Sequence, residues 1–191
     1  MPELIIIAGA NGVGKTTFAR PYTKEYGYDF LNADDIAKEF EDRGEKAPLI
    51  KAGRIFFYKL NEFIESGKSF VVETTLSGSY INKVAERAIK NEYKIKLIYI
   101  FLDTPELCFD RVKMRVKKGG HKVPKEDIER RFYRSINNFW NEMKNTADEW
   151  SLLYNGEYGF QNIAAGEFGN YIIENEAMFH LYLSNLNKNE S

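Results

Sequence analysis

Cysteine is almost absent from this chain, which has one among 191 residues. A lone cysteine excludes an internal disulfide and a cysteine-based zinc site. Cys108 falls in a helical pattern, which predicts a small buried residue and not a nucleophile. No apolar run reaches the ~18 residues that a membrane-spanning helix needs, and the apolar run near the N-terminus is too short for a signal peptide. We therefore expect a cytoplasmic protein with no membrane contact.

An excess of charge of one sign is also missing, because 27 Lys and Arg balance 28 Asp and Glu and leave a formal net charge of −1. Residues 111–134 nevertheless hold ten basic and three acidic residues, a local balance of +7. Such a block predicts a local anion site. The overall balance disfavours long nucleic acid, whose binding rests on many cationic contacts. The chain also lacks N-K-x-D and D-x-x-G sequences, which disfavours a GTPase switch.

Short apolar runs alternate with helical patterns over most of the chain. The expected strands lie at residues 4–8, 29–31, 69–73 and 94–102. The expected helices open at Lys15 and near Asp34, run over 48–65 and 80–90, and start after a cap at Thr104. This alternation predicts an α/β fold in one domain over residues 1–191, with a parallel sheet covered by helices on both faces.

The C-terminal part of the chain is less regular. Short strands are expected near residues 152–154, 162–164 and 171–174, followed by a helix from Glu176. Residues 185–191 are expected to fray, as chain ends commonly do.

A phosphate-binding motif follows the first expected strand. Gly9 to Thr16 read GANGVGKT, which fits the pattern G-x-x-x-x-G-K-[ST]. Its glycines let the backbone approach phosphates, and the N-terminus of the next helix adds partial positive charge. Lys15 is expected to reach the β- and γ-phosphates of ATP, and the Thr16 hydroxyl to ligate Mg²⁺. The expected ATP-binding residues are Gly9, Ala10, Asn11, Gly12, Val13, Gly14, Lys15, Thr16 and Thr17.

Acidic residues follow the second expected strand in the stretch LNADDIA. Carboxyl ends of parallel strands point into the crevice beside the phosphates, where a phosphoryl acceptor needs a carboxylate to take its proton. Asp34 or Asp35 supplies that carboxylate. Asn32 or Asp34 also fits the role of a helix cap, and the two roles are compatible.

Two further strand ends carry polar residues. Glu73, Thr74 and Thr75 end the third strand, where a carboxylate and hydroxyls suit a polyhydroxy substrate or a metal-bound water. Asp103 ends an apolar strand in the manner of a Walker B motif. Thr104 and Pro105 follow it directly, which favours a helix start at that place.

The basic block reads as a hinged flap. One helix carries Arg111 and Arg115 on one face, and Gly119-Gly120 then form a hinge that includes His121. The following helix carries Arg130, Arg131 and Arg134. Arginines on such a flap can close over a transferring phosphoryl group and neutralise its oxygens.

Together these stretches resemble a known family. GANGVGKTTFAR, NADDIA, AGR at residues 52–54, ETTLSG, LDTPELCFDRVKMRVKKGGHKVP and IERRFYRSINN, in this order, resemble the zeta toxin family of P-loop kinases. The likeness is closest to its short, stand-alone bacterial members, and LYNG and IAAGE are similar to their final strands. It implies a three-layer P-loop kinase fold with a helical lid at about 115–134, ATP with Mg²⁺ as the donor, and a UDP-N-acetyl sugar as the acceptor.

The resemblance also implies roles for single residues. Asp34 matches the general base, and Lys15 and Thr16 match the P-loop lysine and the metal ligand. Glu73, Thr75 and, less closely, Arg54 match acceptor-binding residues. The lid arginines match as a region, which leaves Arg130, Arg131 and Arg134 as alternatives for the contact with the γ-phosphate. The family pairs some members with an antitoxin, for which this chain has no signature of its own.

Three functions remain open at this point. The first is an ATP-dependent kinase that acts on a hydroxyl of a small molecule. The second is a nucleotide or RNA-end kinase on the same scaffold. The third is a non-catalytic ATP-dependent interaction module, which has no need of the carboxylate at Asp34.

Overall fold

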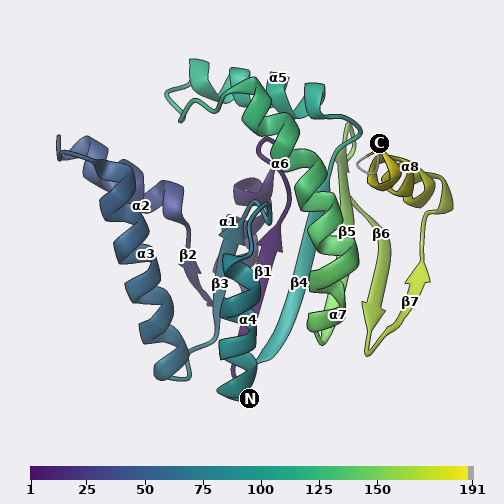
Figure 1. The fold of residues 1–191 in the computed structure, drawn as a ribbon, viewed down its shortest axis with the longest axis horizontal. Helices are drawn as coiled ribbons and strands as arrows, with labels where there is room; N and C mark the ends of the chain where they lie inside the picture. Colours follow the sequence, from purple (N-terminus) through teal and green to yellow (C-terminus); the bar gives the residue numbers. More distant parts are fainter. Residues whose placement is uncertain (189–191) are drawn as a thin grey trace.

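The fold is built on a seven-stranded sheet, seen in a computed structural model that describes residues 1–188 (Figure 1). The strands follow the order β2-β3-β1-β4-β5-β6-β7. Their bounds are β1 Glu3–Ala8, β2 Asp29–Leu31, β3 Phe70–Thr74, β4 Lys94–Phe101, β5 Glu149–Gly156, β6 Gly159–Glu167 and β7 Asn170–Ile173. Where the sequence predicted strands, strands are found.

Helices separate the strands of the N-terminal two thirds of the chain. They are α1 Lys15–Tyr26, α2 Ala33–Asp42, α3 Pro48–Glu65, α4 Tyr80–Lys90, α5 Pro105–Lys117 and α6 Lys125–Asn138. A π-helical turn, η1 Phe139–Met143, and the short α7 Lys144–Thr146 continue α6, and α8 Glu176–Asn187 follows the last strand. Thr104 caps α5 as expected, because its hydroxyl accepts a hydrogen bond from the Leu107 amide at 3.3 Å.

Helices cover both faces of the sheet, as the alternation of elements predicts. Successive residues of a strand point to opposite faces, and Tyr99 stacks on Phe139 of η1 with ring centroids 4.4 Å apart. Its neighbour Ile98 lines a small cavity together with Phe18 of α1. Thus α1 lies on one face of β4 and the continuation of α6 on the other.

The parallel sheet that the sequence predicts is present and is extended by two antiparallel strands, so the complete sheet is mixed. Strands β1 to β5 pair in parallel, whereas β6 and β7 are antiparallel to their neighbours. The physical reason is the connection between β5 and β6, where Gly156 pairs with Gly159 across a two-residue turn. So short a connection joins antiparallel strands only.

The chain end is more ordered than expected. Asn185 is buried, and its side-chain amide donates to the Asp103 carbonyl at 2.9 Å. Tyr182 of the same helix is also buried and donates to the Ile136 carbonyl at 3.0 Å. The expectation of fraying is therefore wrong for residues 185–187, and residues 189–191 lie outside the described part of the chain.

The strand order places a crevice at the carboxyl end of β1. Strand β1 lies between β3 and β4. The strand order therefore runs away from β1 in both directions, toward β2 on one side and toward β5 on the other. Ligands of open parallel sheets bind at this kind of reversal. Because β1, β2 and β3 are parallel, the loops that follow them all lie at this edge of the sheet.

Candidate active site

The loop between β1 and α1 is shaped by its glycines. Gly9 has φ +138°, and a β-carbon there would lie 2.1 Å from the Ile100 carbonyl oxygen. Gly14 has φ +98°, and its β-carbon would lie 2.4 Å from Nδ2 of Asn155. At Gly9 the positive φ and the contact with backbone both exclude a side chain, and at Gly14 the positive φ disfavours one. The loop is thereby held as a cradle at the start of α1.

Lys15 is buried at the centre of this cradle, with 6% of its surface exposed. Its ammonium donates to the Ala10 carbonyl at 2.9 Å and lies 3.9 Å from Oε1 of Glu73. Burial lowers the pKa of Lys15, and the charges of Glu73 and Asp34 oppose that shift. A buried cation with room for an anionic partner is what a phosphate group requires.

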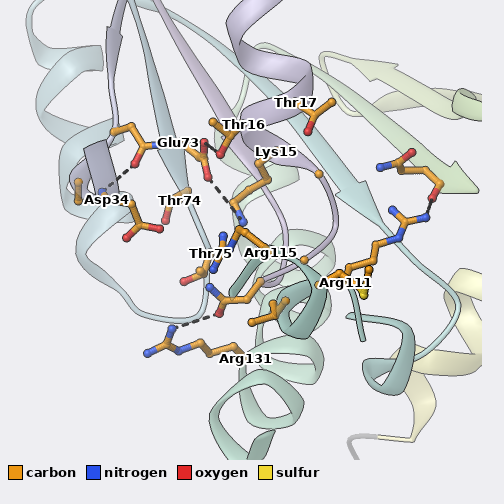
Figure 2. Close-up of a pocket in the computed structure, with 18 of the residues that line it drawn as sticks. Lys15, Thr16, Thr17, Asp34, Glu73, Thr74, Thr75, Arg111, Arg115 and Arg131 are labelled. Atoms are coloured by element: carbon orange, nitrogen blue, oxygen red, sulfur yellow. Dashed lines mark hydrogen bonds and ion pairs between the residues drawn. The ribbon is translucent and has the colours of Figure 1, made fainter. Parts of the chain in front are cut away.

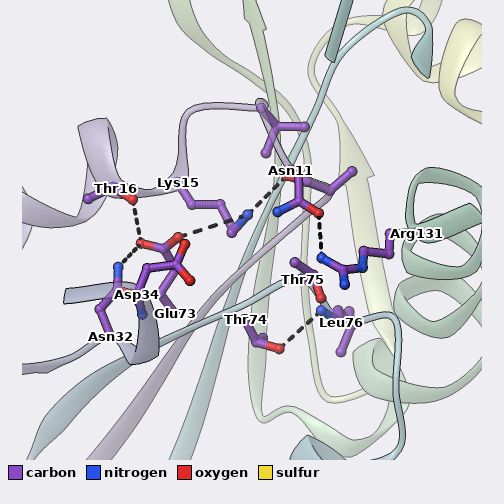
Figure 3. Close-up of polar contacts among 12 residues, drawn as sticks. Asn11, Lys15, Thr16, Asn32, Asp34, Glu73, Thr74, Thr75, Leu76 and Arg131 are labelled. Carbon is purple, nitrogen blue, oxygen red and sulfur yellow. Dashed lines mark hydrogen bonds and ion pairs between the residues drawn. The ribbon is translucent and has the colours of Figure 1, made fainter. Parts of the chain in front are cut away.

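Glu73 joins the cradle to the neighbouring strand (Figure 3). Its Oε2 accepts hydrogen bonds from the Thr16 hydroxyl at 2.8 Å and from Nδ2 of Asn32 at 2.9 Å. Burial raises the pKa of Glu73, and the Lys15 charge and the Thr16 hydrogen bond work against the rise. The carboxylate is thus turned toward the phosphate loop, although the sequence resemblance assigns it to the acceptor.

Asp34 lies at the start of α2, directly after β2. Asn32 caps this helix, because its Oδ1 accepts from the backbone amides of Asp34 at 2.8 Å and Asp35 at 3.4 Å. Asp34 lines the same cavity as Lys15 and Thr16 (Figure 2). Asp35 does not line it, and on the surface its two carboxylate oxygens accept from a single guanidinium nitrogen, Nη2 of Arg20, at 2.8 and 2.9 Å. The rotation of about 100° per helical residue separates the two carboxylates.

The cavity has a volume of about 720 Å³, within the usual range for small-molecule sites. It extends on both sides of the phosphate loop (Figure 2). Asp34, Glu73 and Thr75 lie on one side, and Arg111 lies on the other. The P-loop residues that line it are Asn11, Gly12, Gly14, Lys15, Thr16 and Thr17. Ala10 and Val13 are buried beneath the loop.

One of the three candidate lid arginines reaches the cavity. Arg131 lines it, and its guanidinium donates to Oδ1 of Asn11 at 3.1 Å (Figure 3). Arg130 pairs with Asp127 at 2.6 Å on the exposed side of α6. Arg134 is exposed and does not line the cavity. Residues 130 and 134 share a face of α6, and residue 131 is turned away from that face.

Other expected site residues lie at different distances from the cavity. Thr74 and Thr75 line it, and Thr75 shares a 2.9 Å hydrogen bond with the Ser77 hydroxyl. Arg54 is exposed on α3 and is not among the residues that line it. Asp103 accepts a 2.9 Å hydrogen bond from the Tyr154 hydroxyl and is also absent from the lining, so a Walker B role has no support. Cys108 is buried as predicted, and burial raises the pKa of its thiol to about 12.

Several lining residues had no role of their own in the sequence analysis, which gave Arg111 and Arg115 only as part of the basic flap. Arg111 donates to the Asn155 carbonyl at 3.0 Å, and Arg115 donates to the His121 carbonyl at 3.2 Å in the hinge. Their spacing of four residues inside the basic block was a usable signal. Asn155 also donates from Nδ2 to the Val13 carbonyl at 2.8 Å. It is 142 residues from Val13 in the chain, and no local pattern announces such a contact. Tyr80 and Lys118 also line the cavity.

Comparison with known proteins gives the family. A family model described as an AAA domain matches residues 4–134. The chain belongs to this AAA domain family. An uncharacterized protein of Haemophilus influenzae is 30% identical to this AAA domain protein over 134 residues, which are 68% of this chain and 92% of the relative. The region that the family model matches, residues 4–134, includes the phosphate loop, Asp34, Glu73 and the basic block.

Solved structures share the fold of this AAA domain. The AvrRxo1-ORF1:-ORF2 complex with ATP has a TM-score of 0.76 at 19% identity, over 97% of this chain and 64% of that chain. The PezAT toxin-antitoxin system of Streptococcus pneumoniae has 0.66 at 16%, over 98% and 87%. A kinase of Chloroflexus aurantiacus, described as putative, has 0.56 at 18%, over 70% and 76%. The chain thus spans about two thirds of the AvrRxo1 chain, and its fold is that of P-loop kinase-like proteins.

Within residues 1–188, a candidate membrane span and a preformed metal cage are both absent. No helix in that range combines the length and the apolar character needed to cross a bilayer. No group of three or more His, Cys, Asp or Glu side chains in that range is arranged to hold a metal ion by itself.

Proposed function

We propose that this protein is an ATP-dependent kinase that transfers the γ-phosphoryl group to a hydroxyl of a small molecule. The observation that carries the proposal is the shared cavity of Lys15, Thr16 and Asp34. A phosphate cradle alone suits any P-loop protein. A carboxylate across the same cavity supplies the proton acceptor that transfer to a hydroxyl needs. The proposal treats residues 1–191 as one kinase-like domain with a lid at about 115–134.

The two sides of the cavity suit the two substrates. The nucleotide is assigned to the side of Thr17, Arg111 and Asn155, where side-chain donors and a main-chain carbonyl meet the phosphate loop. The acceptor is assigned to the side of Asp34 and Thr75. The γ-phosphate then lies at Lys15, between the two, which is the arrangement that direct transfer requires.

A magnesium ion fits this set of donors. Thr16 offers a hydroxyl and Glu73 a carboxylate at hydrogen-bond distance from it, 2.8 Å. Mg²⁺ in kinases is held by one or two protein oxygens together with phosphates and waters, so a larger protein cage is not needed. When bound, the ion neutralises charge on the phosphates.

The chain's own residues account for the remaining steps. Asp34 takes the proton of the attacking hydroxyl, because a neutral hydroxyl is a poor nucleophile. Lys15 holds the β- and γ-phosphates, and Arg115 and Arg131 neutralise charge on the transferring group from α5 and α6. Arg115 donates a hydrogen bond to the His121 carbonyl in the lid hinge. Its contact with phosphate would therefore couple transfer to lid position.

The zeta toxin resemblance supports a finer proposal. We infer a UDP-N-acetyl sugar as the acceptor, with Thr75 beside it in the cavity. Glu73 is assigned to the cation instead, and Arg54, which the resemblance also gives to the acceptor, does not line the cavity. The likeness to toxin–antitoxin complexes supports an antitoxin as a partner of this chain. Both inferences place the protein in the cytoplasm, where nucleotide sugars and ATP meet.

One labelling experiment tests the proposal. Purified protein is mixed with ATP labelled at the γ-phosphate and with a metabolite extract, UDP-N-acetylglucosamine, a nucleoside or a 5′-hydroxyl RNA. We expect label on a small molecule with wild type and none with Asp34→Asn, while Asp35→Asn retains it. Label on the RNA alone would establish the RNA-end kinase instead. ATP binding without label on any acceptor would support the non-catalytic module.

A further inference from the structure

Asn32 makes two contacts that connect the halves of the site. This side chain is buried, with 6% of its surface exposed. Its carbonyl oxygen caps α2 by accepting from the amides of Asp34 and Asp35. Its amide group donates to Oε2 of Glu73 at 2.9 Å, on the neighbouring strand β3. One planar group thus touches both the helix of the proposed base and the carboxylate at the phosphate loop (Figure 3).

The contact with Glu73 extends to the cation side of the cradle. The same oxygen of Glu73 accepts from the Thr16 hydroxyl at 2.8 Å. Asn32 and Thr16 therefore hold Oε2 between them, and Oε1 is left to face Lys15 at 3.9 Å. A carboxylate held on one oxygen by two donors has a fixed orientation. The Asn32 side chain also accepts from the Asp34 amide, so the proposed base and this carboxylate share one anchor.

A cap alone does not need an asparagine. Ser, Thr and Asp cap helices about as well, because each offers an oxygen to the free amides. Asp offers no donor, and Ser and Thr carry donor and acceptor on a single hydroxyl oxygen, whereas Asn32 carries them on two separate atoms. The second contact is therefore the feature that distinguishes Asn32 from an ordinary cap.

We propose that Asn32 is a positioning residue that holds Glu73 against Thr16. It thereby fixes the position of the divalent-cation site relative to Asp34. The inference rests on the proposed function, because it presumes that nucleotide binds with a cation at Thr16. Asn32 acts through Glu73 and has no contact of its own with the reacting atoms in this account.

The test separates the donor from the cap. Asn32→Ser keeps an oxygen for the cap and removes the amide N–H that donates to Glu73, leaving only a hydroxyl one bond nearer the backbone. Asn175→Ser is the matched control, because Asn175 caps α8 by accepting from the Met178 amide at 3.1 Å and lies outside the cavity lining. The probe is a non-hydrolysable ATP analogue, whose dissociation constant is measured by calorimetry with MgCl₂ and again with EDTA. Melting temperature reports the cap in both variants.

We expect Mg²⁺ to strengthen analogue binding by wild type and by Asn175→Ser to the same extent. In Asn32→Ser that gain falls about tenfold or more, the scale of a lost hydrogen bond to a charged group. The affinity in EDTA and the melting temperature change no more than in the control. In a Glu73→Gln background, Asn32→Ser causes no further loss of the gain, because it acts through Glu73.

Two results would overturn the inference: an undiminished Mg²⁺ gain in Asn32→Ser, or losses that add independently in the double variant. Should Asn32→Ser fail to fold, Asn32→Thr carries the same test, because it retains the cap oxygen, lacks the amide donor and adds no charge at the cation site. A wild-type protein that binds no nucleotide contradicts the proposed function itself. A different outcome is that nucleotide binds and its gain in affinity with Mg²⁺ is the same in wild type and Asn32→Ser. That result would contradict only the role of Asn32.

Discussion

At the scale of single residues, the site depends on one buried pair of opposite charges. Lys15 and Glu73 are both shielded from water, which raises the free energy of each charge unless a partner is near. Their separation of 3.9 Å is longer than a direct hydrogen bond. The ammonium therefore keeps hydrogen-bonding capacity for a phosphate, and the carboxylate keeps Lys15 from being an isolated cation.

Lys15→Ala should abolish phosphoryl transfer, because the β- and γ-phosphates lose their only buried ammonium among residues 1–188. Nucleotide binding should weaken at the same time. The measurement is label transfer and ATP affinity, with circular dichroism as the folding control. Turnover at the wild-type rate in a folded variant would contradict the assignment of the phosphate loop.

Thr75→Ala should act on the acceptor and leave ATP alone. Thr75 lines the cavity on the Asp34 side, and its hydroxyl shares a hydrogen bond with the Ser77 hydroxyl and not with the phosphate loop. We expect KM for the acceptor to rise about fivefold to tenfold, the scale of one hydrogen bond. The ATP dissociation constant should stay within a factor of two. Equal losses for both substrates would show that the two sides of the cavity are not separate sites.

At the scale of elements, the hinge between α5 and α6 decides whether the arginines reach phosphate. Gly119 has φ +87° and open space around it, whereas a β-carbon on Gly120 would lie 2.6 Å from Cγ of Arg115. The hinge therefore combines a flexible residue with one that packs directly on a cavity arginine. Arg131 of α6 is already bonded to Asn11 of the phosphate loop.

The hinge should become protected when the site fills. Amide hydrogen exchange over residues 117–125 is expected to slow on addition of a non-hydrolysable ATP analogue with Mg²⁺, because Arg115 and Arg131 gain a charged partner. Exchange in α4, which lies outside the lid, serves as the internal reference. Unchanged exchange over 117–125 at saturating analogue would indicate a static basic helix pair.

Most element boundaries were predictable because their signals are local. The helices at 48–65 and 80–90 match their predicted bounds, and Thr104 caps a helix that opens with Pro105. The choice among Arg130, Arg131 and Arg134 was left open from the sequence, although it depends only on how α6 is rotated against the sheet. That rotation follows from the buried stripe of Ile128, Phe132 and Ile136. Applied to helical spacing, the stripe would have favoured residue 131.

At the scale of the whole molecule, the sheet has its site at one end and an ionic cluster at the other. Glu3 of β1 accepts from the Tyr28 hydroxyl at 2.5 Å and pairs with Lys96 of β4 at 2.7 Å. Its backbone amide donates to the Ser69 hydroxyl at 3.0 Å. These contacts connect the starts of four chain segments far apart in sequence.

The Glu3 cluster should make stability depend on pH. Partial burial raises the pKa of Glu3, but the hydrogen bonds from Lys96 and Tyr28 outweigh it and hold the pKa below the usual value of a glutamate. The ionised form is therefore favoured on folding. Its contribution is present above the usual glutamate pKa and is lost as pH falls through the lowered pKa. Glu3→Gln should lower the unfolding free energy at pH 7 by about 1 kcal/mol. Urea titrations in steps downward from pH 7 should show the difference between the two proteins shrink once the pH falls below the usual glutamate range.

Long-range features of the molecule were not readable from the sequence. The phosphate loop, Asp34 and the parallel strands were predictable, because each leaves a local signal in the sequence, either a short motif or a periodic pattern. The contact of Asn155 with the loop joins the β5 end to β1 and follows only from the assembled sheet. Likewise, the acidic stretch LNADDIA offered two carboxylates. Only the capped start of α2 shows that Asp34 lines the cavity and that Asp35 is bound to Arg20.

The central claim is that Asp34 is the base of a kinase, and the comparison of Asp34→Asn with Asp35→Asn tests it most directly. Asn at either position keeps the shape, and the Asn32 cap is unaffected. The measurement is the rate of γ-phosphoryl transfer to the acceptor identified by labelling, with ATP affinity and melting temperature recorded for both variants. The account predicts a loss of about 10²–10⁴-fold for Asp34→Asn with ATP binding intact, and a change below about threefold for Asp35→Asn, whose exposed ion pair is weak. Full activity in a folded Asp34→Asn protein, or loss confined to Asp35→Asn, would contradict it.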